Sequence, residues 1–343
     1  MAVAAGRAKP VREPIGLVLA GGGAKGAYEV GVWESICELG LSSRVRAISG
    51  TSVGGINTAL FASGTPAAKC EGLWLEHMGK VYEASARLAE RISEKRYSAL
   101  LSERLKADAE LAGIAVDDLP KDTVDLAKRE TREKFDRDST LAGVSSIAET
   151  VAKIRTGESP DGLCDSTALR EVLDVAIPGK WPKNAPAAYV SALDSGKWKL
   201  ASFKLNGWGH RARIDRLLAT TAIPGIFDTV AIDGRPYVDG GWEERGGDNV
   251  PAMPILANHP DIKTIIVVYL ASERNLDETR RAKIAEAAGK AGVRVVEVIP
   301  SENIGGGFGG WQGVFDSSPE TAQRLISIGR ADAMKALSGA FAK

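Results

Sequence analysis

Three short glycine-rich segments hold the residues whose types and spacing could do chemistry. The first is Gly21-Gly22-Gly23-Ala24-Lys25-Gly26, the second is Gly50-Thr51-Ser52-Val53-Gly54, and the third is Asp239-Gly240-Gly241. Ser52 offers a hydroxyl nucleophile between small neighbours, which let the backbone turn sharply and let a substrate approach. The backbone N–H groups of the first segment suit a developing oxyanion, and Asp239 offers a carboxylate base. Together these segments would catalyse acyl transfer.

The elements expected around the first two segments bring them side by side. Residues 15–20 form an apolar run that predicts a buried strand, and residues 25–39 carry apolar side chains at helical spacing. Residues 44–49 predict a second strand and residues 56–62 a second helix. This order predicts a parallel sheet with a right-handed crossover. Because the carboxyl ends of neighbouring parallel strands meet at one edge, we expect the glycine loop to lie beside Ser52.

The rest of the chain predicts one α/β domain with a helical insertion. Residues 81–162 are rich in charges of both signs and lack strand patterns, which favours exposed helices at 84–101 and 125–136. Strand patterns return later, and Asp194-Ser195-Gly196 predicts a hairpin turn. Later strands are expected at residues 187–193, 198–205, 262–270 and 293–300 and before Asp239, and later helices at 215–221, 278–291 and 319–337. We therefore expect a three-layer α/β/α domain over residues 15–343, with a mainly parallel central sheet, after a flexible tail of residues 1–14.

The glycine loop has other known uses, and two of them fit poorly. A dinucleotide-binding fold wants an acidic residue at the end of the second strand, where this chain has Ser49-Gly50-Thr51-Ser52. A P-loop needs four residues between its glycines and then Lys-Ser or Lys-Thr, which the loop lacks. A regulatory module that binds a nucleotide or phosphate without catalysis stays an alternative.

The base that would activate Ser52 has two candidates. The chain has three histidines, which are His77, His210 and His259. The order Ser52, Asp239, His259 matches an α/β-hydrolase triad, and a histidine-using esterase is the second alternative. However, Ser52 follows the second strand rather than a later one, and His259 precedes a strand, at the opposite edge of the sheet. Asp239 is therefore the better base, and we expect activity to fall on acidification with a carboxylate-like pKa rather than the ~6.5 of histidine.

The composition of the chain argues against several other classes of function. Lysine plus arginine number 44 and aspartate plus glutamate number 44, so no net charge draws the protein to nucleic acid. Cys37, Cys70 and Cys164 are far apart, and no spacing typical of a metal or redox site occurs, so we expect no metal and no cofactor. The first fifteen residues lack the apolar stretch of a signal peptide, and no apolar run is long enough to cross a membrane. We expect a cytoplasmic protein.

In their order along the chain, the three segments resemble the motifs of the bacterial patatin-like phospholipases. Residues 222–227, Ala-Ile-Pro-Gly-Ile-Phe, also resemble the Ala-x-x-Pro-x-x-Phe segment that precedes the aspartate in that family. The likeness covers residues 15–64 and 163–270. It implies a lipid acyl hydrolase of phospholipase A or lysophospholipase type that works with a Ser–Asp dyad and without calcium. Carried over by position, Ser52 is the nucleophile, Asp239 the base and Gly21, Gly22 and Gly23 the oxyanion loop, with Lys25, Gly26, Gly50, Gly54, Gly240 and Gly241 as supporting motif residues.

The resemblance also implies a phospholipid or other acyl-ester substrate, peripheral contact with membranes, and room for a protein or small activator whose nature stays open. Two segments depart from the family pattern. Residues 81–162 have no counterpart, and residues 242–248 stand between the aspartate motif and Asn249-Val250-Pro251. Because the longer segment falls between nucleophile and base, we expect it to cover the mouth of the site as a lid.

Overall fold

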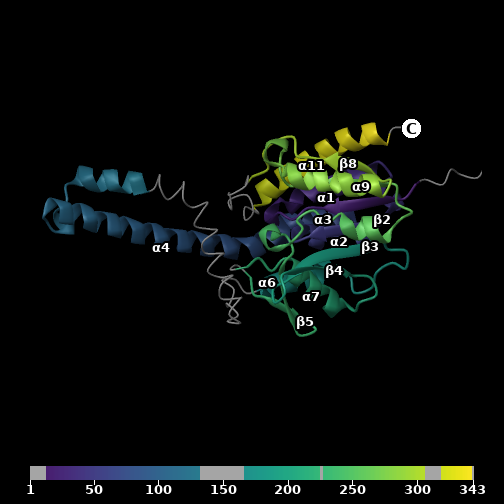
Figure 1. Cartoon of the computed structure of the whole chain (residues 1–343), viewed down its shortest axis with the longest axis horizontal. Coiled ribbons are helices and arrows are strands. Elements are labelled where there is room, and N and C mark those ends of the chain that lie inside the picture. Colours follow the sequence, from purple (N-terminus) through teal and green to yellow (C-terminus); the bar gives the residue numbers. More distant parts are fainter. Residues whose placement is uncertain (1–12, 132–165, 225–226, 306–317, 342–343) are drawn as a thin grey trace, which may run out of the picture.

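An eight-stranded sheet forms the centre of the protein (Figure 1). The computed structural model describes residues 13–131, 166–224, 227–305 and 318–341. Seven strands lie in the order β5-β6-β3-β2-β1-β7-β8, and β4 pairs with β3. The strands are β1 (Ile15–Leu19), β2 (Val45–Thr51), β3 (Ala187–Asp194), β4 (Lys199–Lys204), β5 (Val230–Ile232), β6 (Arg235–Asp239), β7 (Thr264–Val268) and β8 (Arg294–Val298). The strands from β3 to β8 through β2, β1 and β7 are parallel, which confirms the expected mainly parallel sheet.

Helices cover both faces of this sheet. They are α1 (Gly26–Glu38), α2 (Val53–Ala62), α3 (Ala67–Leu73), α4 (Gly79–Ala112), α6 (Thr167–Ala176), α7 (His210–Thr220), α8 (Met253–Asn258), α9 (Glu278–Lys290) and α11 (Pro319–Ala340). Helices α1, α2, α7 and α11 pack on one face. The crossover from β1 through α1 to β2 moves along the sheet in one direction, and the crossover from β7 through α9 to β8 moves in the opposite direction. Because both crossovers are right-handed, α9 lies on the face opposite to α1, beside α8. The three-layer α/β/α arrangement is thereby confirmed.

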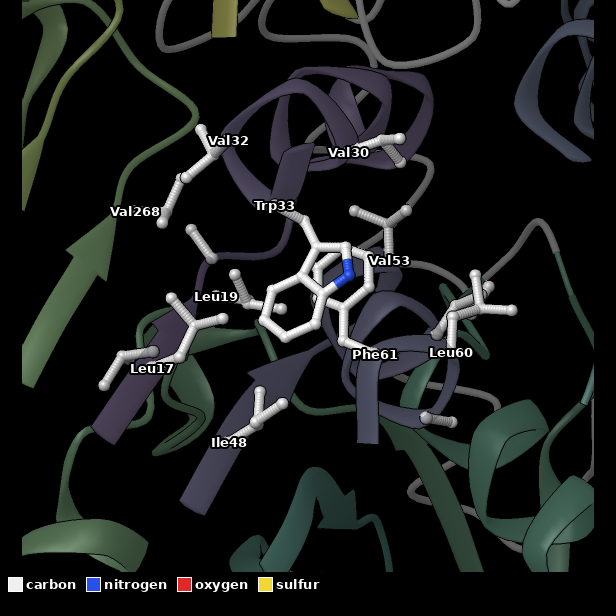
Figure 2. Close-up of a cluster of buried hydrophobic side chains, with 14 of the residues drawn as sticks. Leu17, Leu19, Val30, Val32, Trp33, Ile48, Val53, Leu60, Phe61 and Val268 are labelled. Carbon is white, nitrogen blue, oxygen red and sulfur yellow. The ribbon is translucent and has the colours of Figure 1, made fainter. Parts of the chain in front are cut away.

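The main core lies between the first two helices and the first two strands. Figure 2 shows Trp33 of α1 stacked on Phe61 of α2, with Leu17, Leu19 and Ile48 of the strands around them. The two rings are 4.6 Å apart between centroids and inclined by 6°. All of these side chains are buried. Apolar burial therefore fixes α1 and α2, whose amino ends carry the first two chemical segments, against the sheet.

The insertion begins as one long helix that leaves the body of the protein (Figure 1). Helix α4 has 34 residues and follows α3 through a π-helical turn at Trp74–Met78. Residues 121–131 form a second helix that folds back along it, and Arg104 of α4 pairs with Glu130 at 3.1 Å. Helices were expected here, although the first is longer and the second begins earlier than predicted. Residues 132–165 lie outside the described part of the chain, so the lid stays a prediction.

Several boundaries differ from expectation. Helix α7 begins at His210 rather than at 215, and β5, which the sequence did not indicate, precedes β6 in a hairpin. Strand β6 runs antiparallel to β3. The predicted cap of the last helix is confirmed, because the Thr321 N–H donates to the Ser318 hydroxyl oxygen at 3.3 Å. Among the described helices, none combines the length and the apolar character needed to span a membrane.

Candidate active site

Strand pairing along β3 brings Ser52 and Asp239 together. Strand β2 lies along one edge of β3 and ends with Thr51 opposite Ser191. Strand β6 continues along the same edge, because β4 occupies the other, and it ends with Asp239 opposite Ala192. Since β2 and β6 run in opposite directions, their carboxyl ends meet head to head at neighbouring positions of β3. The nucleophile and base candidates are therefore adjacent although far apart in sequence.

Ser52 occupies a strained turn between β2 and α2. Its backbone angles are φ 54° and ψ −125°, a conformation that L-residues rarely adopt. The turn is tight enough that a methyl group on Gly50 would collide with the backbone of Gly54. A methyl group on Gly54 would lie 2.6 Å from the backbone oxygens of Leu19 and Ala20. Both glycines of the motif are thus required by close backbone approach.

Thr220, at the end of α7, holds the turn from the side. The Ser52 N–H donates to the Thr220 hydroxyl oxygen at 2.9 Å. The same hydroxyl donates to the Ser191 carbonyl at 2.5 Å, so it is fully used and buried. The sequence analysis missed Thr220, since a threonine at a helix end carries no motif of its own.

Asp239 is a buried carboxyl, and no cation of the described residues contributes to its pKa shift. Burial raises its pKa from 3.8 to about 6, against hydrogen bonds from the Ser52 side chain and the Gly241 N–H, which lower the pKa. The Gly241 N–H lies 2.7 Å from Asp239 Oδ1. A carboxyl with a pKa near 6 titrates close to an ordinary imidazole at ~6.5, so the pH at which activity falls does not by itself distinguish the two groups.

The glycine loop closes the site from the side of β1. A methyl group on Gly21 would lie 3.2 Å from the Ser52 Cβ, so this loop touches the turn at Ser52. Gly23 has φ 59°, a left-handed conformation that favours glycine. Within the described residues, the Gly22 and Gly23 N–H groups donate no backbone hydrogen bond. They remain available beside the amino end of α2, where N–H groups favour negative charge.

Asn249 anchors the loop, and the sequence analysis assigned it no role. The Gly21 N–H donates to the Asn249 carbonyl at 3.0 Å, and the Asn249 side-chain amide donates to the Gly21 carbonyl at 3.1 Å. Residues 242–248 do not displace it, because they fold into a closed turn. The Asp248 N–H returns to the Gly240 carbonyl at 2.8 Å, and the Gly247 N–H returns to the Trp242 carbonyl at 2.9 Å. The departure from the family pattern is thus absorbed locally.

A buried polar network supports the far end of the glycine loop. The Asn57 amide of α2 donates to the Gly26 carbonyl at 2.9 Å and to Glu29 at 2.8 Å. The Trp74 indole N–H donates to the Asn57 side-chain oxygen at 3.1 Å. Burial raises the pKa of the Glu29 carboxyl well above its usual value. This network fixes the loop through α1 and α2, and motif patterns contain no sign of it.

Lys25 and the three histidines have partners other than Ser52 and Asp239. The Lys25 ammonium donates to the Leu270 carbonyl at 3.0 Å, and burial lowers its pKa to about 8. The His259 ring lies 3.0 Å from the Tyr189 hydroxyl, His210 pairs with Asp174 and His77 with Glu76. None of these groups contributes to the pKa shift of Asp239. In the described part of the chain, no three metal-ligating side chains gather into a site.

Comparisons with known proteins identify a family for this chain. The family model described as patatin-like phospholipase matches residues 17–256. No curated protein matches the chain. Among solved structures, the chain is similar to VipD from Legionella pneumophila, with 17% identity, a TM-score of 0.46, and coverage of 96% of this chain and 67% of that one. It is also similar to the ExoU–SpcU complex from the type III secretion system of Pseudomonas aeruginosa, with 16% identity, a TM-score of 0.37, and coverage of 95% and 52%. The chain spans about half the length of that second match.

Removing the Thr220 hydroxyl should loosen the nucleophile turn. We expect Thr220→Val to lower the free energy of unfolding by about 1–3 kcal/mol, because it leaves the buried Ser52 N–H without an acceptor. Thr220→Ser, which keeps the oxygen, should restore most of the loss. Urea unfolding followed by circular dichroism measures both changes.

Thr221→Val is the matched control, since its buried hydroxyl bonds only carbonyls of its own helix, those of Leu217 and Leu218. A loss for Thr221→Val as large as that for Thr220→Val would contradict the role given to Thr220.

Proposed function

Because this chain belongs to the patatin-like phospholipase family, we propose that it hydrolyses lipid acyl esters with Ser52 as nucleophile and Asp239 as general base. The family supports lipid acyl hydrolysis in general. The observation that carries the specific proposal is that β3 holds Ser52 and Asp239 at adjacent positions, where the Ser52 side chain acts on the pKa of a buried carboxyl that stands at about 6. A base with that pKa is ionised at neutral pH and still strong enough to accept a proton.

In the proposed reaction Asp239 accepts the Ser52 hydroxyl proton as Oγ attacks the ester carbonyl carbon. The carbonyl oxygen becomes negatively charged and receives hydrogen bonds from the Gly22 and Gly23 N–H groups. The C–O bond to the leaving alcohol then breaks, and Asp239 returns the proton to that alcohol. Asp239 then takes a proton from a water molecule, whose oxygen attacks the carbonyl carbon of the acyl-Ser52 ester. The bond between that carbon and Ser52 Oγ breaks, Asp239 returns the proton to Oγ, and the fatty acid is released.

We further propose an acyl-ester lipid of the phospholipid or lysophospholipid class as substrate, and contact with a membrane surface while the protein itself stays cytoplasmic. An activator, whether protein or small molecule, is compatible with the helical arm of α4, which reaches out from the catalytic body. Its identity is left open.

Ser52→Ala should abolish hydrolysis and leave the fold intact, because it removes a single oxygen from a buried turn. Turnover of p-nitrophenyl butyrate and of a phosphatidylcholine vesicle measures activity, and circular dichroism measures folding. Covalent labelling of Ser52 by a fluorophosphonate gives an independent readout. A folded Ser52→Ala protein with wild-type turnover would contradict the serine mechanism. Tight binding of a nucleotide by a protein that the fluorophosphonate does not label would favour the non-catalytic regulatory module.

The rate should rise with pH through an apparent pKa of about 6, since Asp239 must lose its proton to act as base. Asp239→Asn should lose nearly all activity, whereas His77→Ala, His210→Ala and His259→Ala should each keep most of it. The temperature dependence of the acid limb separates the two groups, because carboxyl ionisation has an enthalpy near zero and imidazole ionisation a large one. A strongly temperature-dependent limb, together with an inactive but folded His259→Ala, would replace the dyad by a triad.

Gly23→Ala should lower kcat on the order of 10²-fold, because it misaims an oxyanion donor. The substitution also strains the backbone at φ 59°, so a matched control is needed. Gly40→Ala supplies it, since Gly40 has φ 68° and an added methyl group meets no atom within 4 Å. Comparison of kcat and of the unfolding midpoint for the two variants separates strain from chemistry. Equal kcat in both folded variants would count against the assignment.

A further inference from the structure

A groove of about 670 Å³ lies on the face of the sheet opposite to α7. Antiparallel pairing of β3 with β4 puts Tyr189 beside Lys204 and Ser191 beside Ser202, and these side chains point to the same face. Tyr189 and Ser191 form the floor, β4 forms one wall, and Pro251 with Met253 of α8 forms the other. Helix α8 packs near β2 rather than over β4, so the layer of helices stops short of this part of the sheet.

The floor of the groove holds a polar group that the protein itself leaves unused. The Ser191 hydroxyl is buried, with 1% of the residue exposed, and it has no hydrogen-bond partner among the described residues. A buried hydroxyl without a partner is costly, so such a group in a cavity wall is a reason to look for a ligand or water there. The volume of the groove is in the range of small-molecule sites.

The walls of the groove are charged at one end and apolar along the side. The exposed Lys204 ammonium makes no ion pair within the described part of the chain, and burial lowers the pKa of the neighbouring His259. Along the side, Met253 is 53% exposed next to the prolines at 251 and 254. At the far end, the Asp248 carboxylate accepts a hydrogen bond from the Val250 N–H at 3.1 Å. A bound anion would therefore sit at the Lys204 end.

We propose that this groove binds a single-chain amphiphile with an anionic head, with the head at Lys204 and the Tyr189–Ser191 floor and the alkyl chain along Met253 and Pro254. The class matches the fatty acid that the proposed hydrolysis releases, and to that extent the identity of the ligand rests on the proposed function. A carboxylate and a phosphate monoester share this chemistry, and the experiment below separates them.

The groove is connected to the nucleophile turn through the segment from Asp248 to Pro251. The Thr51 hydroxyl donates to the Asp248 carbonyl at 2.7 Å, and the Ser49 hydroxyl donates to the Pro251 carbonyl at 2.6 Å. Both donors lie in β2, directly before Ser52. An occupant that presses on this segment therefore bears on the strand end that positions the nucleophile.

Photo-crosslinking tests the proposal without depending on hydrolysis. The Ser52→Ala protein is irradiated with a diazirine-bearing dodecanoate below its micelle concentration, and labelled peptides are mapped by mass spectrometry. We expect labels on the peptides with Leu200–Lys204 and Met253–Asn258, displaced by unlabelled dodecanoate or dodecyl phosphate but not by dodecyltrimethylammonium. The ratio of displacement by the first two competitors tells which anionic head is preferred.

Lys204→Glu should weaken labelling at least ten-fold, and Met253→Glu should do the same through the apolar wall. Lys197→Glu, at an exposed lysine in the β3–β4 turn, is the matched control and should change nothing. Labels confined to the Gly21–Gly26 and Ser52 peptides, displacement by the cationic amphiphile, or labelling unaffected by Lys204→Glu in a folded protein would each overturn the proposal. If the wild-type protein hydrolysed no ester, the proposed function would be contradicted. The labelling result would still test the binding groove independently.

Discussion

The backbone of Ser52 is held at φ 54° and ψ −125°, and the surrounding structure is arranged around that one turn. Such a conformation costs on the order of 1–3 kcal/mol and persists only where neighbours over-determine it. Here the N–H is held by Thr220, the carbonyl accepts the Gly55 N–H at 2.9 Å, and Gly50 and Gly54 allow the chain to close on itself. The helix that follows is locked in turn by the stacked rings of Trp33 and Phe61. Distant packing thus sustains local strain.

Burial of the Asp239 carboxylate at the same site also destabilises the folded protein, by an electrostatic effect. Burial raises the pKa of Asp239 to about 6, so the folded protein binds this proton more tightly than the unfolded chain does. Stability from this group is therefore complete below about pH 4 and is lost as the pH rises through 6, which is where the proposed base would become active. A neighbouring cation would remove the cost, but it would also lower the pKa and weaken the base. Lys25, the cation of the glycine loop, is instead held by the Leu270 carbonyl.

Local pattern predicted the parts of the site, but their assembly depends on strand pairing. Residues 15–62 were predictable because apolar periodicity and glycine turns there agree with the final fold, and the glycine loop and Ser52 turn lie where a parallel crossover puts them. Asp239 was identified by its motif, yet nothing local indicates that β6 reverses and meets β2 on one edge of β3. Thr220, Asn57 and Asn249 each hold the backbone of a distant segment through hydrogen bonds. Such contacts leave no periodic or spacing pattern in the sequence.

The two departures from the family pattern are tolerated for the same physical reason. Residues 242–248 leave β6 and return to it through the hydrogen bond from the Asp248 N–H to the Gly240 carbonyl, so Asn249 resumes beside Gly21. The arm of α4 leaves the body after the π-helical turn at Trp74–Met78, and Trp74 stays hydrogen-bonded to Asn57 under the loop. In each case a residue just before or just after the added segment is hydrogen-bonded to a residue of the candidate site. Insertions closed in this way cost little more than loop entropy, and they can lengthen without moving the turn at Ser52.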